Sequence, residues 1–333
     1  KRETQMAASK EPDFTEAVNY HYEQFPPQNL DPAELLLPLS NAVAALTKYD
    51  VMLRQMRESE ILLAPLRRQE AVVSSRMEGT VTTLEEVLSV EADQSDDDPK
   101  NDRNYRHEAI EVLGYSSAMR GAQSAMQGGT KISEWLIRAT HQRLLRFGRG
   151  HDLKPGTFKT EQNYLADKQK KKILFVPVSP EALKEHMERL IEYIDNSTDH
   201  PLIKAAISHI EFEALHPFND GNGRVGRMLI TLYLWQAEVI SAPHFYVSEY
   251  FEENRDTYID AMRQVSQHND WTSWVVFFLN GLAVQAETKC KQISEIQELY
   301  IEMQDKFRDV LSSKDYLSAV NFVFEQPVFR SSR

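Results

Sequence analysis

Cysteine is nearly absent from this chain, which limits how the fold can be held together. Its 333 residues include one cysteine, Cys290, so no disulfide framework can form within the chain. This usage fits a reducing compartment, and we expect a cytoplasmic protein. The N-terminal stretch "KRETQMAASKEPDF" is polar and has no apolar signal core.

Long hydrophobic runs and an excess of positive charge are also missing. The most apolar stretch, "WTSWVVFFLNGLAV" at 271–284, is too short and interrupted to span a bilayer and predicts a buried helix. Asp and Glu number 50 against 38 Lys and Arg, a net charge of −12. This balance disfavours a general nucleic-acid binder, although it leaves room for a local cationic phosphate pocket.

Helical periodicity dominates what is present, and we predict a mostly α fold. A content of 41% apolar residues supports one large domain or two smaller ones. Thr83 and Glu86 have the spacing of a capping box. The acidic segment 92–104 reads as a solvated linker. Helices are predicted over 31–56, 58–80, 82–91, 105–126, 132–147, 180–195, 201–214, 224–239, 254–267, 270–290 and 293–312.

One region, 156–180, reads as extended. It contains the runs "TFKTEQNYLA" and "ILFVPVS", joined by the basic turn "DKQKKK". Two such runs around a short polar turn predict a β-hairpin in an otherwise helical chain.

The stretch "HPFNDGNGRVGR", 216–227, brings glycines next to reactive side chains. An apolar helical stripe precedes it and a second helix is predicted to begin inside it. A helix N-terminus presents free N–H groups and a partial positive charge. Gly221, Asn222 and Gly223 would let the backbone curl into a concave nest of donors around an anion. The stretch therefore predicts a phosphate cradle.

Charged residues surround this cradle in a fixed order. Arg224 and Arg227 are three residues apart on one helix face and could both contact phosphate oxygens. Asp220 is placed to hold Mg²⁺ or Mn²⁺ on those phosphates. His216 could accept a proton from a hydroxyl near pH 7. Each residue alone would more often be structural, and only their combination indicates a site.

A zinc site is a competing interpretation for part of this region. His209, Glu213 and His216 could be joined as ligands. The two histidines are seven residues apart, on one helix face but two turns from each other, and no further ligand motif follows. We therefore favour the phosphate interpretation.

The same residues resemble a known family. "HPFNDGNGRVGR" is similar to the Fic motif, H-x-F-x-[DE]-G-N-G-R-x-x-R, at every defined position. The hairpin candidate resembles the Fic flap, and the helices from about 132 to 290 resemble a Fic core. "SSRMEG", 74–79, resembles the inhibitory motif [ST]-x-x-x-E-[GN] of this family. The resemblance implies a Fic-type helical bundle with one β-hairpin flap.

The resemblance also implies a division of the chain. Residues 1–104 would form an N-terminal helical region carrying the inhibitory motif, and 105–292 the catalytic core. Residues 293–333 would form a C-terminal helix and, from "YLSAVNFVFEQPVFRSSR" onward, the start of a truncated winged helix.

The implied activity is transfer of AMP from ATP to a Ser, Thr or Tyr hydroxyl of a target protein and of the enzyme itself. By this resemblance His216 is the base and Asp220 is the Mg²⁺ ligand, while Gly221, Asn222 and Gly223 form the phosphate cradle. Arg224 would stabilise charge in the transition state, and Arg227 would contact the γ-phosphate. Phe218 would pack in the core. Tyr258 is a candidate for the adenine pocket.

One further implication concerns the hairpin beside the cradle, where the sequence also departs from the family. Tyr164, Leu165, Ala166 and Asp167 on the flap would hold the target segment as an added strand. This flap is unusually basic, at Lys168 and 170–172, and lacks the glycines common in the family.

Self-inhibition follows from a predicted ion pair. A bond between Glu78 and Arg227 would occupy the arginine that the γ-phosphate needs and repel that phosphate. Ser74, one turn earlier on the same face, would support the arrangement through hydrogen bonds.

Three alternatives stay open at this point. The same site could remove AMP, with Glu78 orienting a water, or transfer a phosphoryl group from a reversed nucleotide. The chain could also be a non-catalytic regulatory or DNA-binding protein, although its acidic balance disfavours DNA. We expect ATP and an unidentified target protein as partners, consider a homodimer, and expect no membrane association.

Overall fold

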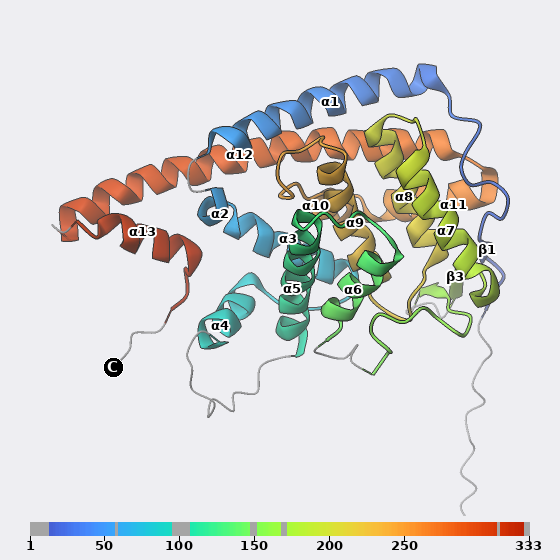
Figure 1. The fold of residues 1–333 in the computed structure, drawn as a ribbon, viewed down its shortest axis with the longest axis horizontal. Coiled ribbons are helices and arrows are strands. Elements are labelled where there is room, and N and C mark those ends of the chain that lie inside the picture. The colour runs from blue at the N-terminus through green and yellow to red at the C-terminus, as the bar shows by residue number, and fades with distance from the viewer. Residues whose placement is uncertain are drawn as a thin grey trace, which may run out of the picture.

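Two long helices form one side of the molecule. The computed structural model describes residues 13–56, 59–94, 107–146, 152–167, 172–311 and 314–329. Helix α1 (Pro32–Gln55) lies along helix α12 (Trp271–Leu311) (Figure 1). The backbone N–H of Asp31, at the start of α1, donates to the Thr272 hydroxyl in the first turn of α12 at 3.0 Å. The two helices therefore run in the same direction.

The remaining helices pack below this pair. The N-terminal region continues with α2 (Ser59–Leu62), α3 (Ala64–Met77) and α4 (Leu84–Gln94). The central part contains α5 (His107–Gln127), α6 (Glu134–Leu144), α7 (Pro180–Asn196), α8 (Pro201–Leu215), α9 (Asn222–Gln236), α10 (Ser248–Glu253) and α11 (Arg255–His268), and α13 (Tyr316–Glu325) follows α12.

The predicted capping box at the start of α4 is confirmed. The Thr83 backbone N–H donates to Glu86 Oε2 at 3.0 Å, and the Glu86 N–H donates to Thr83 Oγ1 at 3.2 Å. Each side chain thus satisfies a backbone donor that the helix leaves without a partner.

Some helix boundaries differ from the predicted ones. The predicted helix 58–80 is divided at Leu63, between α2 and α3. The predicted helices 270–290 and 293–312 are one continuous helix, α12, because no glycine or proline lies between them. The proposed domain boundary at 292 therefore falls inside a helix. The other boundary, at 104, lies outside the described residues.

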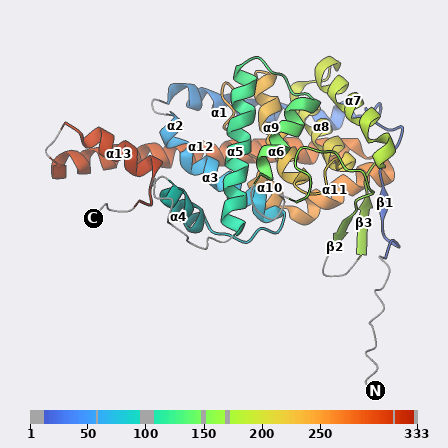
Figure 2. The same cartoon turned by 60° about the horizontal axis from the view of Figure 1, so that its bottom comes forward.

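The β-hairpin is confirmed, with a first strand shorter than the predicted run 157–166 and with an additional strand. Strand β2 (Leu165–Asp167) pairs antiparallel with β3 (Lys172–Val176), and the turn 168–171 lies outside the described residues. Strand β1 (Val18–Asn19), which the sequence did not indicate, pairs parallel with β3 on its other side. The order is β1-β3-β2, so β2 is an edge of this sheet (Figure 2). The mostly α fold with one hairpin flap is confirmed.

Helices α8 and α9 occupy the centre of the fold. Nearly every residue of both is buried, including charged ones such as Glu211 and Arg227. The loop that joins them carries the motif 216–227, so the fold holds this loop between two buried helices. Among the described helices, we find none with the length and apolar character needed to cross a membrane.

Candidate active site

His216 ends helix α8 in a left-handed backbone conformation, with φ 46°. Its backbone N–H donates to the Phe212 carbonyl at 3.0 Å, and its Nδ1 lies 3.3 Å from the Glu213 carbonyl. If Nδ1 carries the proton toward that carbonyl, the lone pair resides on Nε2. Burial, reinforced by the Lys159 ammonium, lowers the pKa of His216 to about 4. The imidazole is therefore neutral at pH 7, the form that accepts a proton.

The loop after His216 is fixed by the Asn222 side chain. Its Oδ1 accepts from the Phe218 N–H and its Nδ2 donates to the Phe218 carbonyl, both at 2.8 Å. Phe218 is fully buried and stacks on the His141 ring at 3.7 Å, as expected of a packing residue. His141 in turn contacts the Asp220 carbonyl through Nε2 at 2.9 Å. The amide of Asn222 is thus used within the loop, and its backbone is what remains for a ligand.

The cradle at the start of α9 is tightly enclosed. Gly221 precedes the helix with φ 78°, a left-handed conformation that glycine adopts without strain. At Gly223, an added Cβ would lie 2.0 Å from Oε1 of Glu78. The Glu78 carboxylate therefore lies directly against the first turn of α9, where an anion is favoured.

Arg227 holds this carboxylate in place. Its Nη2 lies 2.8 Å from Glu78 Oε1 and donates to the Ser74 carbonyl at 2.7 Å, while its Nε donates to the Ser74 hydroxyl at 2.8 Å. Burial alone would raise the pKa of Glu78, but the Arg227 guanidinium reverses this and holds it below its usual value. Glu78 is therefore ionised, and the structure brings together all three residues of the predicted inhibitory contact.

Arg224 lies one turn earlier on α9, and its guanidinium has far fewer hydrogen-bond partners than that of Arg227. Its side chain is 3% exposed, and its Nη2 is 3.5 Å from Asp220 Oδ2. Its Nε and Nη1 are buried without a hydrogen-bond partner among the described residues. Buried polar groups are rarely left unsatisfied, and each exception needs an explanation. A phosphate oxygen would supply the missing acceptor.

Asp220 fits a metal that is shared with phosphates. Its side chain is 41% exposed, so a carboxylate oxygen remains accessible beside the cradle. Mg²⁺ commonly uses one or two carboxylates together with water and phosphate oxygens. The described residues contain no cluster of three or more His, Cys, Asp or Glu side chains that could hold a metal by themselves.

The zinc interpretation of His209, Glu213 and His216 is wrong, because these side chains do not form a metal-binding cluster. His209 Nε2 lies 2.9 Å from the Tyr258 hydroxyl, deep in the core. Burial raises the pKa of Glu213 to about 8, which makes it a neutral acid at pH 7 and a poor ligand. His209, Glu213 and His216 do not assemble as a metal site.

Comparison with known proteins explains this arrangement. The Fic/DOC family matches residues 131–234, and the Fic/DOC family N-terminal region matches residues 36–124, together more than half of the chain. The chain belongs to the Fic/DOC family. The motif at 216–227 lies within the first match and Ser74 and Glu78 within the second.

Similar proteins carry adenylyltransferase names. A protein adenylyltransferase Fic of Nematostella vectensis is 33% identical over 131 residues, which cover 38% of this chain and 29% of that protein. Protein adenylyltransferase fic-1 of Caenorhabditis elegans is 30% identical over 132 residues, 38% of this chain and 24% of that protein. The chain thus spans less than a third of the length of these two curated relatives.

Solved Fic structures share the fold. A Fic family protein from Desulfovibrio desulfuricans G20 matches with a TM-score of 0.67 and 21% identity, covering 91% of this chain and 89% of that one. Fic-1 (residues 134–508) from C. elegans matches with a TM-score of 0.60 and 20% identity, covering 80% and 75%.

The residues predicted to hold the target segment lie in and before β2, whereas Tyr258, the candidate for the adenine pocket, lies in the core. Tyr164 is 44% exposed immediately before β2, and its ring meets Phe14 at 5.3 Å. The flap residues Leu165, Ala166 and Asp167 form β2. Tyr258 is 4% exposed and stacks on Phe251 at 4.6 Å, within an aromatic cluster. Its contact with adenine stays a prediction.

Two residues that contact the loop of the candidate site were not identified by the sequence analysis. Lys159 is 3% exposed, and its Nζ donates to the Leu215 carbonyl at 3.0 Å and to Asn163 Oδ1 at 2.8 Å. Asn163 Nδ2 donates to the carbonyls of His216 and Phe218 at 3.0 and 2.9 Å. Burial lowers the pKa of Lys159 to about 7. Both residues lie in the predicted extended run 157–166, in the part that precedes β2 in the structure, where no local pattern marks them.

Proposed function

We propose that this chain is a protein adenylyltransferase that its own α3 keeps inhibited. The observation that carries the proposal is the Glu78 carboxylate, which lies against the first turn of α9 and is held by Arg227 at 2.8 Å. A cradle that already accommodates one anion is built to accommodate another. The adenylyltransferase names of the similar proteins support AMP transfer as the reaction.

In the proposed reaction, the hydroxyl oxygen of a target side chain attacks the α-phosphorus of ATP. Its proton moves to Nε2 of His216, the P–O bond to pyrophosphate breaks, and pyrophosphate leaves. Arg224 donates from Nε and Nη1, which have no partner among the described residues, to phosphate oxygens as charge develops. Mg²⁺ on Asp220 would neutralise phosphate charge when bound.

Lys159 and Asn163 position the base in this scheme. Lys159 binds the last carbonyl of α8, and Asn163 binds the carbonyl of His216 itself. The charge of Lys159 also helps to keep the imidazole neutral. A base poised in the correct geometry and protonation state is what general-base catalysis requires.

Inhibition would follow from competition for one guanidinium. The three contacts of Arg227 with α3 use Nε and Nη2, so a γ-phosphate must displace the carboxylate to bind there. A charged carboxylate left in the cradle would repel the γ-phosphate, which misplaces the α-phosphorus relative to His216. A misplacement of about 1 Å can cost about 100-fold in rate.

The test compares the wild type with Glu78→Gly, with ATP labelled at either the α- or the γ-phosphate, Mg²⁺ and a cell lysate. We expect strong α-label on protein with the variant and little with the wild type. Label from the γ-phosphate alone would indicate phosphotransfer and would contradict the proposal. Label that the wild type strips from pre-modified protein would indicate AMP removal with Glu78 orienting a water.

A further inference from the structure

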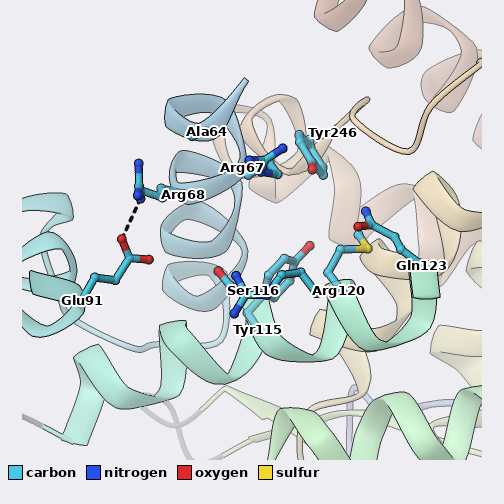
Figure 3. A pocket seen from close by; sticks show the side chains of 10 residues that line it. Ala64, Arg67, Arg68, Glu91, Tyr115, Ser116, Arg120, Gln123 and Tyr246 are labelled. Carbon is cyan, nitrogen blue, oxygen red and sulfur yellow. Dashed lines mark hydrogen bonds and ion pairs between the residues drawn. The ribbon is translucent and has the colours of Figure 1, made fainter. Parts of the chain in front are cut away.

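A second cationic cavity lies away from the Fic motif, between α3, α4 and α5. Its volume is about 90 Å³. Arg67 and Arg68 reach it from α3 and Arg120 from α5, while Glu91 of α4 is the single carboxylate among the side chains that line it (Figure 3). The lining therefore carries two more positive than negative charges, on a protein that is strongly acidic overall.

The arginines of this cavity are incompletely satisfied. Arg68 donates from Nε to Glu91 at 2.7 Å and from Nη2 to the Glu325 carbonyl at 2.5 Å, but its Nη1 is buried without a partner among the residues that the structure describes. Arg67 contacts Glu60, whose side chain is 74% exposed, so that pair is screened by solvent. Arg120 is exposed on α5 and lines the same cavity, and it forms no hydrogen bond or ion pair with any described residue, so its guanidinium faces solvent and is available to an anion.

The active site offers a direct parallel within the same molecule. Arg224, where phosphates are expected, also has buried guanidinium nitrogens without a partner. Arg68 repeats this feature beside a cavity, with two more arginines at hand. Guanidinium groups match the oxygens of phosphate and carboxylate groups with paired hydrogen bonds, and three of them around one cavity favour an anion with several oxygens, such as phosphate, over a halide.

The size of the cavity restricts the ligand further. Pockets that enclose drug-sized molecules usually measure about 300–1,000 Å³. A cavity of about 90 Å³ accommodates one phosphate group and excludes an enclosed nucleotide. The ligand is therefore inorganic phosphate or the phosphate end of a phosphomonoester whose remainder stays in solvent.

We propose that this cavity is a phosphate-binding site that ties the inhibitory helix α3 to α5. Arg67 and Arg68 occupy the first half of α3, and Ser74 and Glu78 its end. A phosphate bridging these arginines to Arg120 would remove the repulsion between them and add contacts across the two helices. Phosphate would thereby strengthen the seating of Glu78 in the cradle. This regulatory part rests on the function proposed above, and the binding part does not.

Binding is tested by isothermal titration calorimetry of the full chain with inorganic phosphate, at ionic strength held constant with chloride. The variants are Arg120→Ala, Arg224→Ala and, as a matched control on the exposed surface of α12, Arg308→Ala. Circular dichroism in the absence of phosphate checks that each variant is folded.

We expect Arg120→Ala to weaken phosphate binding about tenfold or more, because hydrogen bonds to charged groups are the strong ones. Arg308→Ala should bind like the wild type, and Arg224→Ala should retain the site. The proposal is overturned if the wild type binds no phosphate at millimolar concentration, if Arg120→Ala binds normally, or if binding is lost with Arg224→Ala, which would place the phosphate in the Fic cradle.

Regulation is tested by self-labelling from α-labelled ATP with and without phosphate. Phosphate should lower labelling severalfold in the wild type but not in Arg120→Ala or Glu78→Gly. Equal inhibition of wild type and Arg120→Ala would overturn the regulatory link, because phosphate would then compete with ATP. Absence of labelling in every variant would contradict the proposed function alone, while the calorimetric result still decides the site.

Discussion

The two sides of the Fic cradle differ in how their arginines are satisfied. On one side, Arg227 spends three hydrogen bonds on α3, two on Ser74 and one on Glu78. On the other, Arg224 keeps Nε and Nη1 buried, with no hydrogen-bond partner in the part of the chain that the structure describes. The two guanidinium groups are one turn apart on α9 and equally buried. The difference therefore comes from what faces them: the chain supplies its own anion to one side and leaves the other side to a ligand.

This comparison separates two roles that the motif combines. In the proposed function, the side of Arg224 is left unsatisfied for a phosphate, and active sites commonly carry such a cost in stability. The side of Arg227 is satisfied by the proposed inhibitory contact with Ser74 and Glu78. Substitution of the base His216 or the metal ligand Asp220 should abolish or strongly reduce AMP transfer. Substitution of Glu78 should raise transfer, and substitution of Lys159 should alter its pH dependence.

The largest effect is expected for His216→Ala, which removes the base that both sides serve. Transfer should fall by about 100- to 10,000-fold, the usual contribution of general-base catalysis. ATP affinity should change little, since the arginines and backbone donors remain. Label transfer and ATP binding are measured on the same preparation. Unchanged labelling would remove His216 from the mechanism.

Asp220→Ala should come next. The loss of the carboxylate removes the accessible oxygen ligand beside the cradle and should weaken the dependence on Mg²⁺, with transfer reduced by about 100-fold at fixed metal. Titration of Mg²⁺ against labelling rate, in the Glu78→Gly background so that transfer is measurable, provides the readout. A titration curve identical to that of the parent would contradict this assignment.

Substitution of Lys159, the cation beside His216, should shift the pH dependence of kcat/KM. In Lys159→Met, His216 loses both a positive neighbour and the anchor on the Leu215 carbonyl. The pKa of His216 should rise from about 4 towards its ordinary value of 6.5. The acidic limb of kcat/KM against pH should therefore move to higher pH. Lys159→Arg keeps the positive charge, so its acidic limb should lie closer to that of the wild type. If Lys159 had a merely structural role, the acidic limb would have the same position in Lys159→Met as in the wild type.

The ion pair between Glu78 and Arg227 should make a small, pH-dependent contribution to the free energy of unfolding. The folded-state pKa of Glu78 lies below its ordinary value of 4.5 because of Arg227. Its contribution is thus fully present above about pH 4.5 and is lost as pH falls through the lower folded-state value. Because a third of the side chain is exposed, we expect at most about 1 kcal/mol. The difference in Tm between wild type and Glu78→Gln, followed from about pH 7 to about pH 3, should narrow towards acid. A constant difference would contradict the ion pair.

The motif residues were predictable because they are contiguous. Residues 216–227 combine a base, a carboxylate, glycines and arginines in one stretch, and their order alone indicated a phosphate site. Glu78 could be predicted only through the family motif, because 149 positions separate it from its partner Arg227. The hairpin was predicted from its two extended runs.

What could not be predicted depends on contacts across the fold. Lys159 becomes a positioning residue only because the chain returns it to the end of α8, 56 positions later in the sequence. Strand β1 has two residues and exists because β3 offers it a free edge. The sequence analysis predicted two helices, 270–290 and 293–312, where the structure has one, although no glycine or proline lies between residues 290 and 293.

The most direct test of the shared-arginine account is a double-mutant cycle between Glu78→Gly and Arg227→Ala, read as the rate of α-label transfer. The account predicts that Glu78→Gly raises transfer about 10- to 100-fold while Arg227 is present, the range of typical coupling energies. In the Arg227→Ala background the same change should raise transfer less, because the guanidinium that it frees is gone and only the repulsion between the carboxylate and the γ-phosphate is relieved. An equal rise in both backgrounds would contradict the claim that Glu78 inhibits by holding Arg227.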